Sequence, residues 1–456
     1  MDGDRHDAPS AAGVTDLKRT LGARDIAIIT AGTIVGSGIF LTPGLVLASS
    51  GLVGVALLVW TVGGILALLG TLTYAELGCL RTGTGGLYIY LRDGFGSATA
   101  FVFGWTLFVV IASGTVASGS VATADNLAVL VPLGPAARKV VALTVIAGLA
   151  LLSVRSTRQS TTVLTVGTII KVGALVVLIV ALPLVGKGFS QVDHFFPERL
   201  DWSMLSGALT GMISVLWAYD GWQYATFMGG EVREVQRNFP RGLITGTLAA
   251  LVVYVLVNAG YVAGLGPERL AVSTTVGSDA VGAMFGPVAA KLLAVAVLVS
   301  IITGTHAILL TSSRVLYAMA RDGAFFQRLS RVHSRFGTPA NSIVSIAVWA
   351  AALALSGRFN TLLTYVVFVS WIFYALGALA VIALRRKEPH AARPFKVPGY
   401  PATPIIFAAA AGVVVLNVVV TTPIRGAVGI GGTLLGFPVY YIWKARRRRE
   451  VSSTGA

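Results

Sequence analysis

Apolar stretches of about 20 residues recur along almost the whole chain, from Leu21 nearly to Trp443. An α-helix needs about 20 apolar residues to cross the hydrocarbon core of a bilayer. Only 12% of the residues are charged, whereas a soluble domain usually carries about 25%. The pattern therefore predicts an all-α polytopic membrane protein and excludes a soluble enzyme and a disordered chain. The one cysteine, Cys79, excludes an internal disulfide.

The apolar stretches divide into about twelve transmembrane helices. The predicted spans are 25–49, 53–80, 97–125, 137–154, 159–185, 203–229, 241–265, 282–313, 340–356, 361–384, 402–422 and 425–443. An even number of spans places both termini on one side of the membrane. Residues 1–20 are polar and lack the pattern of a signal peptide, so we expect a tail there. The other predicted units are a membrane core over 21–384, a loop with helices 11 and 12 over 385–443, and a basic tail over 444–456.

Lysine and arginine are distributed unevenly between the two sides of this topology. The two tails and the loops on their side hold 26 of the 35 basic residues. By the positive-inside rule that side is cytoplasmic, which predicts a multi-pass protein of the cell (inner) membrane with cytoplasmic N- and C-termini. The basic run from Lys444 to Arg449 could bind nucleic acid. Its place beside the last helix favours anionic lipid, so we expect no nucleic-acid partner.

The first span is interrupted near its middle by Gly36, Ser37 and Gly38, and Pro43 follows shortly after. Within a bilayer, unpaired backbone is tolerated only where it lines a cavity or is buried in protein. A break here would leave N–H groups free at the start of a half-helix, where they attract an anion such as a carboxylate. The alternative is that the glycines only allow close contact between helices.

The sixth span carries a second interruption, the segment 217–222 (WAYDGW). Two interrupted helices in corresponding halves of a chain indicate the binding site of a transporter. Gly38 and Gly221 are 183 residues apart, a separation that fits five helices in each repeat. Of the aromatic residues near the breaks, Trp217 is the best candidate for a gate over a substrate. The others are either gates or core packing: Tyr219, Trp222, Trp371, Phe373 and Tyr374.

Two ionisable residues lie deep inside predicted spans. Asp220 has three interpretations: it accepts hydrogen bonds at the break, contacts a substrate ammonium, or carries a coupled proton. An acid at this depth costs about 2.5 to 3.5 kcal/mol on insertion scales and needs a partner. Lys171 lies too far from either end of its span to reach water easily. It either occupies the place of a sodium ion or titrates during transport.

The remaining polar residues give weaker signals. Lys291 lies nearer the outer end of its span and is expected to reach the interface. His306 is the one histidine inside a span, and such a residue is more often a packing and hydrogen-bonding group than a proton relay. The sequence holds no metal-ligand spacing. We therefore expect no metal, no cofactor and no catalytic residues.

Several short motifs taken together resemble a known group of proteins. They are 36–40 (GSGIF), 74–78 (YAELG), 85–88 (GGLY), 217–222 (WAYDGW), 230–232 (GEV), 236–241 (QRNFPR), 312–314 (SSR) and 393–401 (RPFKVPGYP). With these motifs the chain resembles the amino acid–polyamine–organocation (APC) superfamily, and most of all the L-type amino-acid transporters and their bacterial relatives. The resemblance covers the chain from Leu21 to about Pro394.

The resemblance implies a fold and a substrate site. The fold is the leucine-transporter type (LeuT fold), a 5+5 inverted repeat over about 21–185 and 203–384 with discontinuous helices 1 and 6, followed by two extra helices. The substrate carboxylate would meet the amides of Gly36, Ser37 and Gly38. The substrate amino group would meet carbonyls around Thr33, Ile34, Trp217, Ala218 and Tyr219. Asp220 and Gly221 complete the predicted substrate site.

The same resemblance implies that Lys171 replaces a sodium ion and ties helix 1 to helix 8, where Ser300 or Thr303 would be its contact. The chain departs from the eukaryotic L-type pattern at Asp220, where those relatives carry glycine. His306 falls where many relatives carry asparagine. Both departures weaken any transfer of substrate preference from that group.

The sequence thus predicts an amino-acid permease, not an enzyme. It would carry zwitterions across the cytoplasmic membrane by alternating access, as a sodium-independent secondary transporter or exchanger. Proton symport through Lys171 or Asp220 is the alternative. A non-transporting amino-acid sensor is disfavoured by tails too short for a soluble domain, and an intramembrane enzyme by the lack of a catalytic constellation. The sequence leads to no inference of an obligate partner subunit, because Cys79 is not on an extracellular loop where a disulfide between subunits would form.

Overall fold

The computed structural model describes residues 17–199, 201–356, 359–421 and 423–454, and in these ranges every regular element is a helix. Eight helices are long and apolar enough to cross a membrane, and three shorter helices are also apolar. The prediction of an all-α polytopic membrane protein is therefore confirmed. The elements are α1 (Ala23–Ile34), α2 (Gly38–Leu41), α3 (Pro43–Ser50), α4 (Val53–Leu80), α5 (Leu87–Phe95), α6 (Ser97–Thr106), η1 (Leu107–Ala112), α7 (Ser113–Leu130), α8 (Pro135–Arg155), α9 (Thr157–Val185), η2 (Gly188–Gln191), α10 (Trp202–Ala218), η3 (Tyr224–Glu231), α11 (Val235–Leu265), α12 (Pro267–Val272), α13 (Val276–Arg321), η4 (Gln327–Ser330), α14 (Ala340–Leu355), α15 (Phe359–Lys387), α16 (Ala402–Thr421), α17 (Pro423–Leu434) and α18 (Gly436–Thr454).

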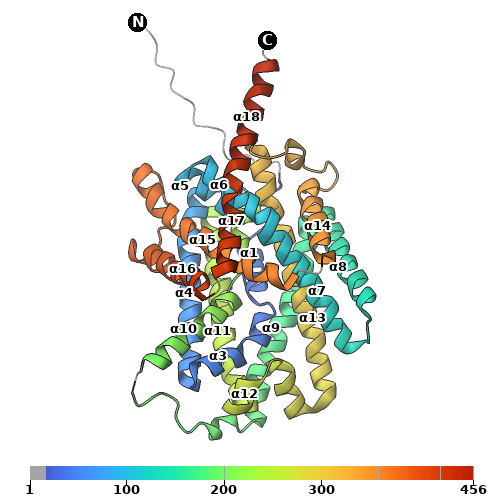
Figure 1. Cartoon of the computed structure of the whole chain (residues 1–456), viewed down its shortest axis with the longest axis vertical. Coiled ribbons are helices and arrows are strands. Elements are labelled where there is room, and N and C mark those ends of the chain that lie inside the picture. The colour runs from blue at the N-terminus through green and yellow to red at the C-terminus, as the bar shows by residue number, and fades with distance from the viewer. Residues whose placement is uncertain (1–16, 200, 357–358, 422, 455–456) are drawn as a thin grey trace.

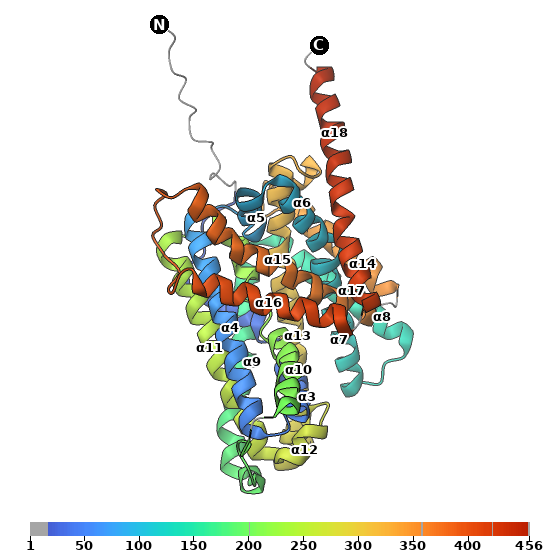
Figure 2. The same ribbon diagram turned by 60° about the vertical axis from the view of Figure 1, so that its left-hand side comes forward.

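The helices form one elongated bundle, in which α4, α9, α11 and α13 run along the long axis (Figure 1). Helix α1 packs against α11 and α9 in the interior, and α11 also packs against α4. Helix α18 projects beyond one end of the bundle, where α5 and α6 also lie (Figures 1 and 2). We call this end the terminal face. Helices α3 and α12 lie at the opposite end.

Several elements differ from the predicted spans for local reasons. Helix α13 runs from Val276 to Arg321, longer than the predicted 282–313, and bends at Gly286, which has φ 81° and precedes Pro287. The predicted span 97–125 contains a π-helical turn, η1, where the hydroxyl of Ser113 donates to the carbonyl of Phe108 at 2.7 Å. Such turns insert one residue into a helix and disturb its ladder of hydrogen bonds.

Two predicted spans are not continuous helices. The predicted span 203–229 ends as an α-helix at Ala218, and residues 224–231 continue as the 3₁₀ helix η3. The predicted span 425–443 is divided between α17 and α18 at residue 435, and α18 continues past 443 to Thr454. The first difference arises at Gly221, whose φ of 134° no helix accepts.

Candidate functional site

The first helix breaks at the predicted place. Helix α1 ends at Ile34, and Val35 leaves the helical region with φ −71° and ψ 85°. The helix resumes at Gly38 as α2, so the chain is not helical over 35–37. Gly36 and Ser37 are half-buried, whereas Thr33 and Ile34 are buried. The break therefore leaves short stretches of backbone in the bundle interior that are partly accessible.

The second break lies directly against the first. Helix α10 ends at Ala218, and a turn over 219–223 follows. A Cβ at Gly38 would lie 2.9 Å from the Cα of Ala218, and a Cβ at Gly221 would lie 2.6 Å from the carbonyl carbon of Thr33. Glycine is required at both positions because a side chain would collide with the opposite backbone. The structure thus brings together the residues that the sequence placed at the two breaks.

Two hydroxyl groups connect the breaks. The Thr33 hydroxyl is 2.9 Å from the carbonyl oxygen of Gly221. The buried Tyr254 hydroxyl, on α11, is 2.8 Å from the carbonyl of Ile34 and 3.2 Å from that of Ala218. It therefore lies between the last carbonyls of both broken helices. Sequence reasoning missed Tyr254, although a phenol in an apolar helix needs a hydrogen-bond partner.

Asp220 is held by neighbours at the second break. Its Oδ1 accepts a hydrogen bond from Nε2 of Gln223 at 3.0 Å, and Oε1 of Gln223 accepts one from the amide of Gly221 at 3.2 Å. The Gln223 side chain is fully buried and also contacts the Tyr374 hydroxyl. These contacts fit the interpretation of Asp220 as a hydrogen-bond acceptor. The sequence analysis named Tyr374 as a possible gate but missed Gln223.

Lys171 and Ser300 hold the end of α1 from two sides. The fully buried Lys171 donates from Nζ to the carbonyl of Gly32, and the Ser300 hydroxyl is 3.3 Å from the carbonyl of Val35. The Thr303 hydroxyl instead bonds to carbonyls of its own helix, at 2.8 Å and 3.3 Å. Among the described residues, Lys171 has no hydrogen bond to Ser300 or Thr303. Helices α9 and α13, which also pack directly against each other, therefore each hydrogen-bond to the end of α1.

Most of the aromatic residues near the breaks are packed in the core. The ring centroid of Tyr219 lies 4.9 Å from that of Tyr254, and the ring of Trp222 lies 4.8 Å from that of Tyr74. Both Tyr219 and Trp222 are about 1% exposed. Trp217 is only half-buried, and its ring edge would be 3.6 Å from a Cβ at Gly38. Of these aromatic residues, Trp217 lies beside the break and is partly accessible.

The structure also shows the surroundings of Lys291 and His306, the residues that gave weaker signals in the sequence. Lys291 is exposed, which fits an interfacial position. His306 is fully buried, and neither of its ring nitrogens has a hydrogen-bond partner among the described residues. In the same part of the chain, no three His, Cys, Asp or Glu side chains gather as metal ligands would.

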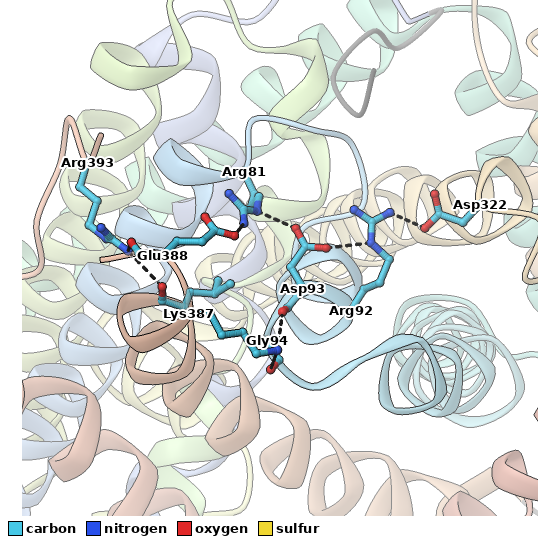
Figure 3. A network of polar contacts seen from close by, with 9 residues as sticks. Arg81, Arg92, Asp93, Gly94, Asp322, Lys387, Glu388 and Arg393 are labelled. Atoms are coloured by element: carbon cyan, nitrogen blue, oxygen red, sulfur yellow. Dashed lines mark hydrogen bonds and ion pairs between the residues drawn. The ribbon is translucent and has the colours of Figure 1, made fainter. Parts of the chain in front are cut away.

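A network of ion pairs at the terminal face was missed by sequence reasoning (Figure 3). Asp93 bridges two arginines, at 2.6 Å from Arg81 and 2.9 Å from Arg92. Arg92 also reaches Asp322 at 2.5 Å, and Arg81 pairs with Glu388. Burial lowers the pKa of the Arg81 guanidinium, but its hydrogen bonds to Glu388 and Asp93 outweigh that effect and raise the pKa above its ordinary value. This terminal-face network joins α5 to the ends of α4, α13 and α15.

A second, buried ion pair joins η3 to α13. The Arg314 guanidinium lies 2.7 Å from the Glu231 carboxylate, and the two side chains are 0% and 2% exposed. Arg314 also donates to the hydroxyl of Thr157 at 2.9 Å. The carbonyl of Glu231 accepts the amides of Thr20 and Leu21 at 2.9 and 3.0 Å. Both motifs that supply this pair were recognised in the sequence, but their contact was not.

A helical bundle of this hydrophobicity, with two broken helices that meet in its interior, has the architecture of a multi-pass membrane transport protein. The family described as amino acid permease matches residues 21–442, and the chain belongs to that family. The chain is thus an amino-acid permease and not an enzyme.

Individual relatives cover nearly the whole chain. The serine/threonine exchanger SteT of Bacillus subtilis (strain 168) is 30% identical over 94% of this chain and 98% of its own length. The b(0,+)-type amino acid transporter 1 of Rattus norvegicus is 31% identical over 90% of this chain and 84% of its own. The large neutral amino acids transporter small subunit 2 of Mus musculus is 29% identical over 96% and 83%, respectively.

Proposed function

We propose that the two breaks form the binding site for the amino-acid substrate of this permease. The observation that carries the proposal is their direct contact, at Gly38 against Ala218 and at Gly221 against Thr33. Backbone groups on both sides of this contact have left regular helix. A zwitterion needs donors for its carboxylate and acceptors for its amino group within a few ångströms, and two abutting breaks supply both.

Each end of the zwitterion has its own set of groups in this proposal. The amides of Gly36, Ser37 and Gly38 precede α2 and would bind the carboxylate. The carbonyls around Thr33, Ile34, Trp217, Ala218 and Tyr219 would accept hydrogen bonds from the amino group. Trp217 is the gate, because it is half-buried beside the break.

The buried ammonium of Lys171 supports sodium-independent transport. Its charge lies at the carbonyl of Gly32, two residues before α1 ends. When protonated, this side chain would stabilise the free carbonyls at the end of α1, as a bound cation would. Proton symport through Lys171 or Asp220 is the second candidate, because both side chains are ionisable groups at the breaks.

The relatives' names agree with this function, since they describe a serine/threonine exchanger and transporters of amino acids. One name describes a small subunit. Transport by the purified chain alone tests whether the present chain needs a partner subunit. The excess of basic residues makes the terminal face the cytoplasmic one. The ordering of helices 1 to 10 as a 5+5 inverted repeat is part of the same proposal.

The site is tested by uptake of labelled amino acids into proteoliposomes. Gly38→Val places a branched side chain against Ala218 and should abolish uptake. Gly148→Val is the matched control, because a Cβ at Gly148 meets no atom within 4 Å, and its uptake should stay normal. Normal uptake by a monodisperse Gly38→Val protein would refute the binding site.

The coupling of transport to sodium, protons or exchange is tested with substitutions of two lysines. Lys171→Ala should stop transport or make it depend on sodium, whereas Lys291→Ala should change little because Lys291 is exposed. Both variants and the parent are assayed with and without sodium, internal amino acid and a pH gradient. Uptake by the parent that requires a pH gradient would favour the symport alternative, and unchanged transport by Lys171→Ala would remove the lysine from the mechanism.

A further inference from the structure

The last helix carries an unusual density of charge outside the bundle. Five of the six residues from Lys444 to Arg449 are basic, and α18 extends through all of them to Thr454. Figures 1 and 2 show this part of α18 projecting beyond the terminal face. Lys444 and Arg446 are exposed, and among the described residues neither makes an ion pair.

The turn of α18 just before this run is rich in aromatic residues, and one side of it is packed against the bundle while the other side is exposed. On one side the ring of Trp443 lies 4.7 Å from that of Phe326 and 6.0 Å from that of Phe325. On the other side Tyr441 and Ile442 are 60% and 57% exposed. Aromatic residues with one apolar and one wet end mark the interface between membrane and water. The basic run therefore begins at the depth of the lipid headgroups.

A second basic segment lies beside α18. Phe326, which contacts Trp443, is two residues before Arg328. Arg328 and Arg331 are both exposed. In the described ranges, neither of these arginines forms an ion pair. Unpaired guanidinium groups from two elements thus lie at the same level of the molecule.

We propose that α18 from Lys444 onward, together with Arg328 and Arg331, binds the headgroups of anionic phospholipids. The exposed apolar side of Tyr441 and Ile442 distinguishes a lipid from a nucleic acid as the partner, because it offers contact to acyl chains at the same place. Basic clusters directly beside a membrane helix attract anionic lipid. The bound lipid would hold α18 against Phe325 and Phe326, which follow the end of α13, and against Phe101 of α6, whose ring lies 5.4 Å from that of Tyr440.

The test compares two variants of the full chain with the same loss of charge. The first carries K444Q, R446Q, R447Q, R448Q and R449Q. The control carries R19Q, R24Q, R233Q, R237Q and R241Q, which remove five exposed basic residues on the predicted cytoplasmic side from the segments 19–24 and 233–241. For each purified protein we measure the phosphatidylglycerol molecules retained in native mass spectrometry and the rise in Tm on adding phosphatidylglycerol, relative to phosphatidylcholine.

We expect phosphatidylglycerol to be retained and to raise the Tm of the parent. Only the α18 variant should lose this response, because its basic residues supply the attraction to the anionic headgroups. Equal losses in both variants, or a parent that does not prefer phosphatidylglycerol, would overturn the proposal. A short oligonucleotide that stabilises the parent more than the lipid does would assign the run to nucleic acid instead. Should a charge variant not be monodisperse, quenching of Trp443 by brominated phosphatidylglycerol, with Trp443→Phe as reference, decides the question in the otherwise unchanged chain.

Discussion

Two sets of ion pairs in this permease differ in burial, and the difference separates fixed contacts from breakable ones. The Glu231–Arg314 pair is 0–2% exposed and lies between η3 and α13. In the terminal-face network the Arg81 and Asp93 side chains are 22% and 20% exposed, and Glu388 is 39% exposed. Both sets connect distant segments of the chain, but water reaches only the second.

Burial decides what each set can do during transport. Breaking a buried pair leaves an uncompensated charge in a medium of low dielectric constant, which costs about 3–5 kcal/mol. Separating a fully exposed pair costs about 0–1 kcal/mol, because water solvates both partners, and the half-buried pairs of the terminal-face network are nearer to that limit than the buried pair is. We therefore expect η3 and α13 to stay together in all states. The ends of α4, α5 and α15 can instead separate when the terminal face opens.

The largest effect is expected for the buried pair. Glu231→Ala leaves the Arg314 guanidinium without its carboxylate and should destabilise the fold by about 3–5 kcal/mol. The measurement is thermal unfolding of the purified protein, followed by the yield of monodisperse protein on size exclusion.

A double variant sharpens this prediction. Glu231→Leu combined with Arg314→Met removes both charges and should recover most of the lost stability, because apolar residues of similar size can replace a buried pair. A single variant with a parental Tm, or a double variant no more stable than the single one, would show that burial of charge is not the cause.

Asp93→Asn should have a smaller effect on stability but a clear effect on how easily water-soluble reagents reach the interior from the terminal face. The change weakens both arginine contacts and should cost about 1 kcal/mol or less. Cys79, the one cysteine, is 3% exposed and lies two residues before Arg81. Opening of the terminal face should therefore raise its rate of labelling by a water-soluble maleimide several-fold.

The matched control for this variant is Asp125→Asn. Asp125 forms a more exposed ion pair, at 3.2 Å from Arg138, and its segment is not part of the terminal-face network. Labelling of Cys79 should be unchanged in this control. Equal labelling in Asp93→Asn and the parent would show that the network does not restrict access.

The smallest expected effect is that of salt concentration on the rate of Cys79 labelling. Raising the ionic strength from 0.1 M to 1 M shortens the Debye length from about 10 Å to about 3 Å. Labelling of Cys79 in the parent should rise modestly, whereas labelling in Asp93→Asn should rise less because its network is already weakened. The buried pair is shielded from ions, so the stability difference between the parent and Glu231→Ala should not depend on salt.

Much of the fold was predictable because membrane helices are encoded locally. The apolar stretches gave the membrane class, and Gly36, Gly38 and Gly221 marked the breaks. At Gly38 and Gly221 a side chain would collide with the backbone of the other broken helix. The exact ends of the spans were harder to predict from the sequence. The stretch after Ala218 is less apolar but still holds several aromatic and apolar residues, so the predicted span continued to residue 229 although α10 ends at Ala218.

The partners within the site were not predictable in the same way. Tyr254 is 36 residues from Ala218 and 220 from Ile34 along the chain, and Gln223 meets Tyr374 across 151 residues. A helix that is apolar on every side gives no periodic signal of which side faces inward. The rotation of α11 that brings the Tyr254 hydroxyl to both breaks is therefore invisible in the sequence.

The sequence by itself determined that this chain lies in a membrane, which side carries the positive charge, and where two helices cannot continue. Each of these properties depends on residues close together in the chain and on their exchange between water and lipid. Tertiary structure decided which carbonyl each buried donor reaches and which charges lose contact with water. Those outcomes depend on the packing of helices from distant parts of the chain, as the pairing of Glu231 with Arg314 across 83 residues shows.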